Sequence, residues 1–306
     1  MRVKVSCLVP VRDKAYFVGH TVKSTLDQTY PCEILLSDQG STDGSLDILK
    51  YHQAGYRGPH KVRVLECPDT DPKGMAGFNA HIDWLMDQTD ADLIIIVSAD
   101  DLNHPDRVKR TVEEYLIHRP SFIGTKMQFL NPPTDSTLKM ELAGITAFDP
   151  KGSRFISARE HIEQLVGGSV STAWDRAFYD RVGGLRDHLV PDVYLPFLAT
   201  LDRGFYMIDE QLFAHLCHKN AKNTGLGGRM RAADDDGEML FLNELANYQI
   251  VSTLYEAGRV AVQAFPEAWS SSDAAEPLHQ NIVARTNDWV QCRHLLNQRG
   301  VPPRVL

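Results

Sequence analysis

The chain has 306 residues, and its 32 Lys and Arg against 40 Asp and Glu give a formal charge of −8 at pH 7. A composition of 43% hydrophobic and 24% charged residues is typical of globular proteins that bury a sizeable core. It excludes disordered, collagen-like and coiled-coil proteins, and the negative charge argues against an extended nucleic-acid-binding groove.

The cysteines and the apolar runs bear on the cellular compartment. Five cysteines stand apart without a Cys-x-x-Cys pair, and an odd number without a secretion signal favours a reducing compartment. The longest aliphatic run, residues 93–97, is far shorter than the ~20 residues of a membrane-spanning helix. We therefore expect a cytoplasmic protein with no integral membrane segment.

Strand and helix patterns alternate four times at the start of the chain. Short aliphatic runs predict strands, and apolar residues at helical spacing predict helices. The strands are expected at residues 3–9, 33–36, 62–65 and 92–97, and the helices at 15–29, around 46–49, at 76–88 and from 105 through 116. This order predicts an α/β fold with a doubly wound, mostly parallel sheet, whose ligand crevice lies at the carboxyl ends of the strands.

The alternation ends near residue 120. Residues 122–148 predict strand and loop, residues 157–183 helix, and residues 204–213 an extended segment. Helical patterns follow from about residue 230, with a loop at 266–277 and a last helix near 278–298. The second part of the chain is therefore expected to be less regular and to end in helices.

Two carboxylates, Asp100 and Asp101, directly follow the apolar run of the fourth strand. Adjacent carboxylates repel each other unless a cation or solvent intervenes, and oxygen ligands suit Mg²⁺ or Mn²⁺. A divalent ion at this position could hold a diphosphate. A solvated helix N-cap explains the same two residues, and the residues alone leave both interpretations open.

A polar turn with two glycines, residues 38–44, follows the second strand. Glycine allows a close approach of the backbone, and the helix N-terminus behind the turn can face an anion or a base edge. A plain capping turn is the alternative. The segment has neither the Walker A pattern nor G-x-G-x-x-G, which excludes those two nucleotide-binding folds.

Several blocks in this order resemble inverting glycosyltransferase family 2. They are residues 5–13, 24–31, 36–45, 73–79, the Asp-x-Asp-type metal segment at 98–101, and the acceptor-side segment at 177–185. The resemblance implies a GT-A (Rossmann-like) fold over residues 1–225, with a nucleotide-sugar-binding half at 1–120 and an acceptor-binding half at 121–225. A helical C-terminal extension at 226–306 matches no block of the family.

The resemblance also implies the residues of the donor site. Those expected to bind the donor nucleotide are Pro10, Val11, Asp13, Asp38, Lys73, Asn79 and Asp101. Among them Asp38 would hydrogen-bond the base, Lys73 would lie against the diphosphate, and Asp101 would lie next to the donor sugar.

Asp100 and His218 are the metal ligands that the resemblance implies, for Mn²⁺ or Mg²⁺. A surface-loop histidine is the alternative for His218. Zinc held by His215, Cys217 and His218 is disfavoured, because their spacing matches no common zinc pattern.

Inversion requires a base that takes the proton of the acceptor hydroxyl. The family's Glu-Asp pair corresponds to Pro191-Asp192 here, so we predict Asp192 as the general base, with Asp187 in reserve. An exposed Asp after a proline turn is the alternative. Ser98 departs from the family pattern as well, because it replaces the first Asp of the metal segment.

Three further features are open to more than one interpretation. Trp174 is expected either to stack on the acceptor or to lie in the core. Lys222, Arg229 and Arg231 form either a basic lid over the diphosphate or a solvated loop. The C-terminal helices would close the acceptor site, form a homo-oligomer, or cap the sheet.

Together these features predict an inverting, non-processive glycosyltransferase with a nucleoside diphosphate sugar, by default a UDP-sugar, as donor. The Gln-x-x-Arg-Trp block of processive synthases is absent. The acceptor hydroxyl would belong to a saccharide, a lipid-linked glycan, a protein or a modified nucleobase. A nucleotide-sugar-binding protein that has lost catalysis is the alternative, which Ser98 and Pro191 suggest. A nucleotidyltransferase is disfavoured, because no glycine-rich loop follows the first strand.

Overall fold

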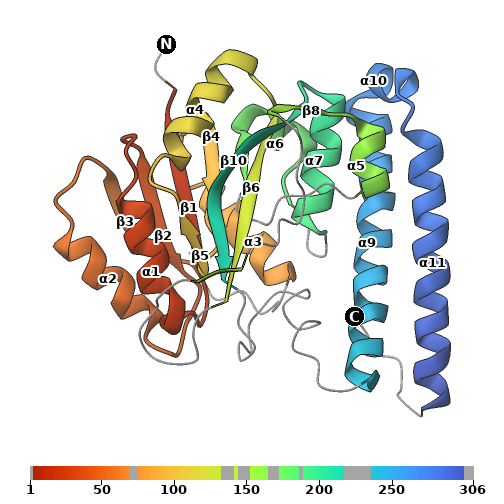
Figure 1. Cartoon of the computed structure of the whole chain (residues 1–306), viewed down its shortest axis with the longest axis horizontal. Coiled ribbons are helices and arrows are strands. Elements are labelled where there is room, and N and C mark those ends of the chain that lie inside the picture. The colour runs from red at the N-terminus through yellow and green to blue at the C-terminus, as the bar shows by residue number, and fades with distance from the viewer. Residues whose placement is uncertain are drawn as a thin grey trace.

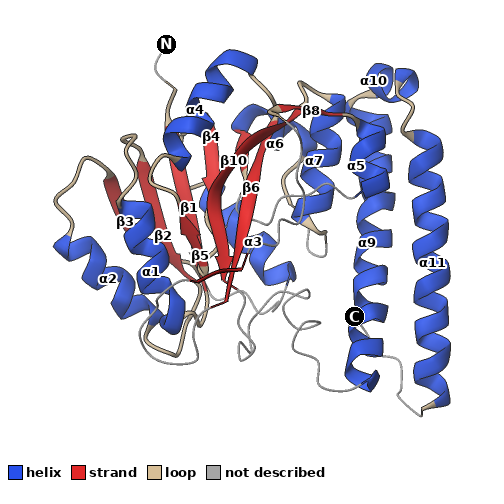
Figure 2. Ribbon diagram, viewed as in Figure 1, coloured by secondary structure: helices blue, strands red, loops and turns tan. Residues whose placement is uncertain are grey.

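The computed structural model describes residues 3–68, 75–131, 141–143, 152–164, 172–185, 189–216 and 236–299, and the statements below refer to these ranges. Helices flank one central sheet (Figures 1 and 2). The strands are β1 (Val5–Val11), β2 (Glu33–Asp38), β3 (Lys61–Glu66), β4 (Leu93–Ile96), β5 (Asp101–Asn103), β6 (Phe122–Asn131), β7 (Glu141–Ala143), β8 (Arg154–Ile156), β9 (Ala173–Asp175) and β10 (Phe205–Leu216). The helices are α1 (Ala15–Leu26), α2 (Ser45–Gly55), α3 (Met75–Met86), α4 (Arg107–His118), α5 (Ala158–Gln164), α6 (Arg176–Val182), α7 (Pro191–Leu201), α9 (Asp236–Ala264), α10 (Pro266–Ser271) and α11 (Ala275–Gln298).

The first half of the sheet is parallel, as the alternation of strands and helices predicts. The strands run in the order β3-β2-β1-β4, and each neighbouring pair is parallel. All residues of β1 are buried because helices cover the sheet on both sides, which explains the continuous apolar run of this strand. The predicted α/β class is therefore confirmed, and the predicted parallel arrangement of the sheet holds for this half.

The strand β1 continues through Pro10 to Val11, whereas the sequence pattern predicts a strand that ends at residue 9. Pro10 pairs with Ser37, and Val11 pairs with Asp38. The pairing of β1 with β4 ends earlier, at Leu8, so the missing N–H of Pro10 leaves no gap in that ladder.

The second half of the sheet is mixed. The strand β9 is antiparallel to both β4 and β6, whereas β10 is parallel to β6 and antiparallel to β5 and β8. The prediction of helix across 157–183 is wrong at β9, where Trp174 pairs with Ile94 and Phe122. A strand of three residues carries too little local pattern to be recognised, and its two neighbours in the sheet decide its conformation.

The helices α9 and α11 form a long antiparallel pair beside α5 and α7 (Figure 1). Leu254, Ala257 and Ala261 of α9 belong to the same hydrophobic cluster as Tyr194 and Phe197 of α7. The C-terminal helices therefore share one core with the predicted acceptor-binding half. A short helix, α10, occupies part of the predicted loop at 266–277. The division between residues 225 and 226 stays a prediction, because residues 217–235 lie outside the described residues.

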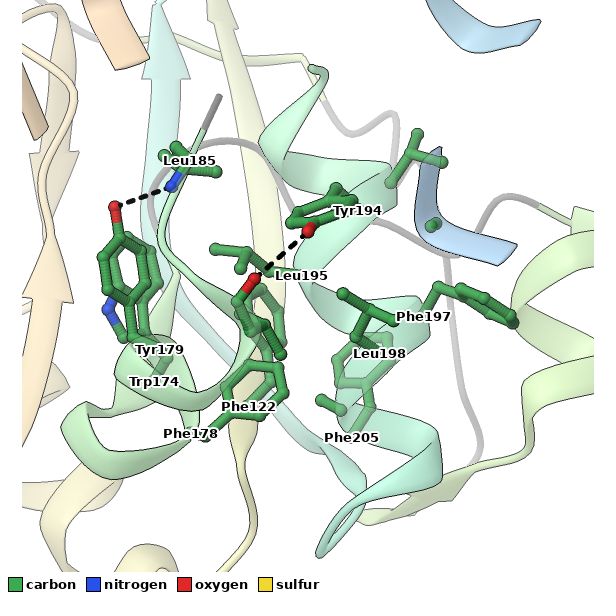
Figure 3. Packing of buried hydrophobic residues seen from close by; sticks show 14 of the residues in the cluster. Phe122, Trp174, Phe178, Tyr179, Leu185, Tyr194, Leu195, Phe197, Leu198 and Phe205 are labelled. Atoms are coloured by element: carbon green, nitrogen blue, oxygen red, sulfur yellow. Dashed lines mark hydrogen bonds between the residues drawn. The ribbon is translucent and has the colours of Figure 1, made fainter. Parts of the chain in front are cut away.

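The core under the acceptor-side half is rich in aromatic rings (Figure 3). The Phe122 ring contacts the Phe205 ring edge to face, with 5.2 Å between centroids. The Tyr194 hydroxyl donates to the carbonyl oxygen of Val182 at 3.4 Å, which ties α7 to α6. This packing supports the N-terminal end of α7. In the described part of the chain, none of the helices has both the length and the apolar character to span a bilayer.

Candidate functional site

The loops that follow β1 and β2 are joined by backbone and side-chain hydrogen bonds. The Gln39 amide donates to the Val11 carbonyl at 2.9 Å, and the Asp13 amide donates to Ser41 Oγ at 2.9 Å. In return the Thr42 amide donates to Asp13 Oδ1 at 2.8 Å. Asp13 has a φ of +48°, in the left-handed region that few residues other than glycine adopt. Its carboxylate is thus part of the turn that shapes this edge of the sheet.

The N-terminus of α1 is held by the second of these loops. The Ala15 amide donates to Asp43 Oδ2 at 2.8 Å, and the Lys14 amide donates to Ser45 Oγ at 2.8 Å. Burial alone would raise the pKa of Asp43, but hydrogen bonds from Ser45 and Ala15 keep it below its ordinary value. The two loops therefore form one firmly connected unit at the carboxyl ends of β1 and β2.

Asp38 ends β2 inside this unit and is 3% exposed. Its Oδ2 accepts a hydrogen bond from the Ser41 amide at 2.9 Å. Its Oδ1 is buried and has no hydrogen-bond partner among the described residues. A buried carboxylate oxygen without a donor is costly, so a ligand N–H at this position would be strongly favoured.

Asp100 follows β4 at the same edge, and each of its oxygens has a partner. Ser98 Oγ donates to Oδ1 at 2.7 Å, and the Lys14 ammonium lies 2.6 Å from Oδ2. The side chains of Lys14 and Asp100 are only 14% and 8% exposed. The ion pair spans from the loop after β1 to the loop after β4, in the middle of the predicted donor site.

The metal-ligating groups near Asp100 suit a cation that the protein and a bound ligand coordinate together. Among the described residues, no three His, Cys, Asp or Glu side chains are grouped to hold a metal ion. Mg²⁺ is commonly bound by one or two carboxylates together with the phosphates of a substrate, and not by a cage of protein ligands alone. Asp100 provides such a carboxylate, whereas the predicted second ligand, His218, lies outside the described residues.

Asp101 lies at the start of β5 and is paired with a histidine that we did not predict as a site residue. In the antiparallel ladder of β5 and β10, His215 is directly opposite Asp101. His215 Nδ1 lies 2.8 Å from Asp101 Oδ1, and Asp101 is fully buried. The sequence indicated an extended segment only up to residue 213, so nothing but the pairing of β10 with β5 places His215 here.

Asp192 lies in the first turn of α7, directly after Pro191. It is partly buried and lines a small pocket, together with Phe78, Ile96, Thr172, Trp174, Leu185, Pro191 and Leu195. Burial raises the pKa of Asp192 to about 7, the Asp101 carboxylate adds to the rise, and His215 opposes it. A carboxylate with a pKa near neutrality is suited to accept a proton at physiological pH.

Two buried side chains hold the segment that enters α7. Asn79 of α3 donates to the carbonyl oxygen of Leu189 at 2.9 Å. The amide of Val190 donates to Thr253 Oγ1 of α9 at 3.0 Å. Both side chains are fully buried. Asn79 therefore connects the donor-side half to the predicted base, and its contact with the nucleotide stays a prediction.

Trp174 is 2% exposed and lies on β9. Its ring is stacked between Tyr179, at 5.4 Å and 10° between the ring planes, and Phe122, at 6.4 Å and 13° (Figure 3). This is the position of a core tryptophan, the second of the two interpretations. Because the residue also lines the pocket beside Asp192, its contact with an acceptor stays a prediction.

The remaining predicted site residues fall into two groups. Pro10 and Val11 lie at the carboxyl end of β1, beside Ser37 and Asp38 of β2. The residues outside the described ranges are Lys73, Asp187, Cys217, His218, Lys222, Arg229 and Arg231. The structure thus brings together the loops of Asp13 and Asp38, and it brings Asp101, which we predict beside the donor sugar, close to His215 and to the predicted base Asp192.

Solved structures of other proteins resemble the fold of this chain. S. aureus TarS (residues 1–349), in complex with UDP-GlcNAc, is 14% identical to the chain, with a TM-score of 0.57 over 94% of this chain and 79% of TarS 1–349. The mannosyltransferase PcManGT from Pyrobaculum calidifontis, in complex with GDP-Man and Mn²⁺, is 13% identical, with a TM-score of 0.60 over 100% of this chain and 77% of that protein. At such identities the likeness shows the fold. None of the curated protein sequences matches the chain.

The sequence itself matches one protein family. The model of that family, described as glycosyl transferase family 2, matches residues 6–174, which is more than half of the chain. The matched residues include β1 through β4, the loops around Asp13 and Asp38, and the segment with Asp100 and Asp101. Because the family model covers more than half of the chain and the fold agrees with it, we conclude that the chain belongs to glycosyl transferase family 2 and is a glycosyltransferase.

Proposed function

We propose that this glycosyltransferase moves a sugar from a nucleoside diphosphate sugar to an acceptor hydroxyl, with inversion and one transfer at a time. The observation that carries the proposal is Asp192, a carboxylate that lines a small pocket and whose pKa is raised to about 7, in part by the charge of Asp101. A base next to the donor-sugar position is what inversion in a single displacement requires.

The donor nucleotide is proposed to bind at the carboxyl ends of β1 and β2. Pro10, Val11 and Asp13 line the base, and Asp38 Oδ1, which lacks a donor among the described residues, accepts an N–H of the base. Uracil and guanine both present such an N–H. UDP-sugars are the default donors, and the bound UDP-GlcNAc and GDP-Man of the two structural relatives support a choice between these two nucleotides.

Asp100 is proposed to hold Mn²⁺ or Mg²⁺ jointly with the donor diphosphate, with His218 as a second ligand and Lys73 against the diphosphate. The Mn²⁺ bound by the P. calidifontis relative supports this assignment. When bound, the metal neutralises the negative charge of the departing diphosphate.

On the acceptor side, Asp192 takes the proton of the acceptor hydroxyl while the oxygen of that hydroxyl bonds to the anomeric carbon of the donor sugar. The bond between that carbon and the diphosphate oxygen breaks on the opposite face, and the nucleoside diphosphate leaves. The Asp101 carboxylate, held by His215, lies beside the donor sugar. Its negative charge favours the positively charged character of the sugar in the transition state.

The acceptor is proposed to approach along α7, where the C-terminal helices hold the backbone through Thr253. A saccharide, a lipid-linked glycan, a protein or a modified nucleobase would each supply the hydroxyl. Association of the C-terminal helices into a homo-oligomer is supported by exposed apolar side chains on α9 and α11. These are Tyr255, Val262, Val283, Val290 and Leu295.

The proposal is tested by calorimetric titration of UDP, GDP and dTDP, each with and without Mn²⁺, followed by turnover assays with the sugar conjugates of the nucleotide that binds. We expect one nucleotide to bind in a metal-dependent way and its conjugate to be consumed. Binding without hydrolysis or transfer would identify a nucleotide-sugar-binding protein instead. No binding of any nucleotide would overturn the donor site.

A further inference from the structure

The ion pair between Lys14 and Asp100 lies where the donor site needs a cation. The Lys14 ammonium is 2.6 Å from Asp100 Oδ2, and both side chains are largely buried. The Lys14 backbone is fixed as well, because its amide donates to Ser45 Oγ at 2.8 Å. The lysine therefore reaches Asp100 from a firmly held position and is not a mobile surface side chain.

Two described side chains contact the Asp100 carboxylate. Ser98 contributes a hydroxyl donor to Asp100 Oδ1 and no charge. The Lys14 ammonium contributes a positive charge that directly offsets the carboxylate, and the neighbouring Asp101 is bound to His215. Breaking a largely buried ion pair leaves an uncompensated charge, which is more costly than breaking a pair on the surface.

We propose that Lys14 is a resident cation of the donor site, which pairs with Oδ2 of the Asp100 carboxylate until a divalent ion arrives together with the donor diphosphate. This inference rests on the proposed function. A bare metal ion would have to displace the ammonium, and among the described residues it would gain the Asp100 carboxylate without further grouped carboxylates, histidines or cysteines. A metal ion with a diphosphate brings further oxygen ligands, and the diphosphate provides a new anionic partner for the displaced ammonium. Lys14 thereby makes metal binding depend on the nucleotide.

The experiment measures binding of Mn²⁺ to the whole protein without nucleotide, by calorimetry and by the electron paramagnetic resonance signal of free Mn²⁺. We compare the natural chain with Lys14→Met, which removes the charge and retains the length of the side chain. We expect Lys14→Met to bind Mn²⁺ at least about tenfold more tightly, because the ion no longer competes with an ammonium. Lys14→Arg retains the charge and should behave like the natural chain.

Lys23→Met is the matched control, because Lys23 lies on α1 in an exposed ion pair with Asp27. It should leave the Mn²⁺ affinity unchanged. In the double variant Lys14→Met/Asp100→Asn the gain in affinity should vanish, which assigns the gain to Asp100. Equal Mn²⁺ affinities for Lys14→Met, Lys23→Met and the natural chain would overturn the inference.

A measurement on the natural chain alone keeps the inference testable if Lys14→Met does not fold. Mn²⁺ should bind at least about tenfold more tightly in the presence of the nucleotide that the protein prefers than in its absence. Equal Mn²⁺ affinity in both cases would contradict the role of Lys14. Failure of the proposed function would appear differently, as no binding of UDP, GDP or dTDP, while the nucleotide-free comparison of the variants would still be decisive.

Discussion

The predicted donor side and the predicted acceptor side of this enzyme are built in different ways. On the donor side, consecutive loops at the ends of parallel strands are joined by hydrogen bonds from backbone amides to side-chain oxygens, such as those of Asp13 with Ser41 and Thr42. Towards the acceptor side, Asp192 comes from a helix, and Asp101, which we predict beside the donor sugar, is paired with His215 from a strand far away in the chain. A site built from consecutive loops leaves a compact pattern in the sequence, whereas a site assembled from distant elements does not.

The largest expected effect is on the rate of transfer, and it comes from a substitution on the acceptor side alone. Replacement of Asp192 by Asn should lower the rate of transfer by about 10²–10⁴-fold, because the acceptor hydroxyl loses its base. Calorimetric affinity for the donor nucleotide should be unchanged, since Asp38 and its loop remain intact. Asp273→Asn, at an exposed position between α10 and α11, is the control. A parallel loss of transfer and nucleotide binding would assign Asp192 to the donor site.

The pH dependence of kcat also distinguishes the acceptor side from the donor side. Because the Asp192 pKa is raised to about 7 and a base acts when deprotonated, kcat should rise with pH and level off above about 7. Below that midpoint kcat should fall by about tenfold per pH unit, while nucleotide affinity changes little. His215→Gln removes the group that lowers the Asp192 pKa, so the midpoint should move to higher pH. A kcat that is constant between pH 5 and 8 would contradict this role.

Asn79 connects the predicted donor side to the segment that carries Asp192. Its replacement shows whether transfer, nucleotide binding or both depend on this contact. Asn79→Ala leaves the buried carbonyl of Leu189 without its donor, which should lower the free energy of unfolding by about 1–3 kcal/mol. We expect kcat to fall, because the segment that enters α7 loses this support, and the nucleotide to bind more weakly, because Asn79 is also a predicted donor contact. Urea unfolding, steady-state kinetics and calorimetry measure these effects, with exposed Asn297→Ala as the control. An unchanged nucleotide affinity would contradict the predicted donor contact.

The smallest expected effect is confined to the donor side. Asp38→Asn replaces a charged acceptor by a neutral one, so the nucleotide should bind about tenfold more weakly. The maximal rate at saturating donor should change little, because the acceptor side is unaffected. Titration calorimetry and kinetics at high donor concentration check this result. Exposed Asp87→Asn, at the end of α3, should leave both quantities unchanged. A lower maximal rate with unaltered affinity would place Asp38 outside base recognition.

The amino-acid sequence by itself determined the parallel half of the sheet and the edge at which its polar loops meet. The alternation of strands and helices imposes that edge, because carboxyl ends of parallel strands lie together. The resemblance added Asp38, Asp100 and Asp192 as candidates, and the family model confirmed the family. The ion pair of Lys14 with Asp100 has no signal in the sequence, because a long side chain can reach many partners.

The arrangement of the second half of the sheet and of the C-terminal helices was decided only by the tertiary structure. The strand β9 is too short for a local pattern, and its conformation depends on β4 and β6. The contact of His215 with Asp101 depends on the register of β10 against β5, which is fixed by packing across the whole sheet. The sequence also left the role of the C-terminal helices open. Their packing in one core with α7, and the hydrogen bond from Val190 to Thr253, depend on contacts between segments far apart in the chain, which no local pattern encodes.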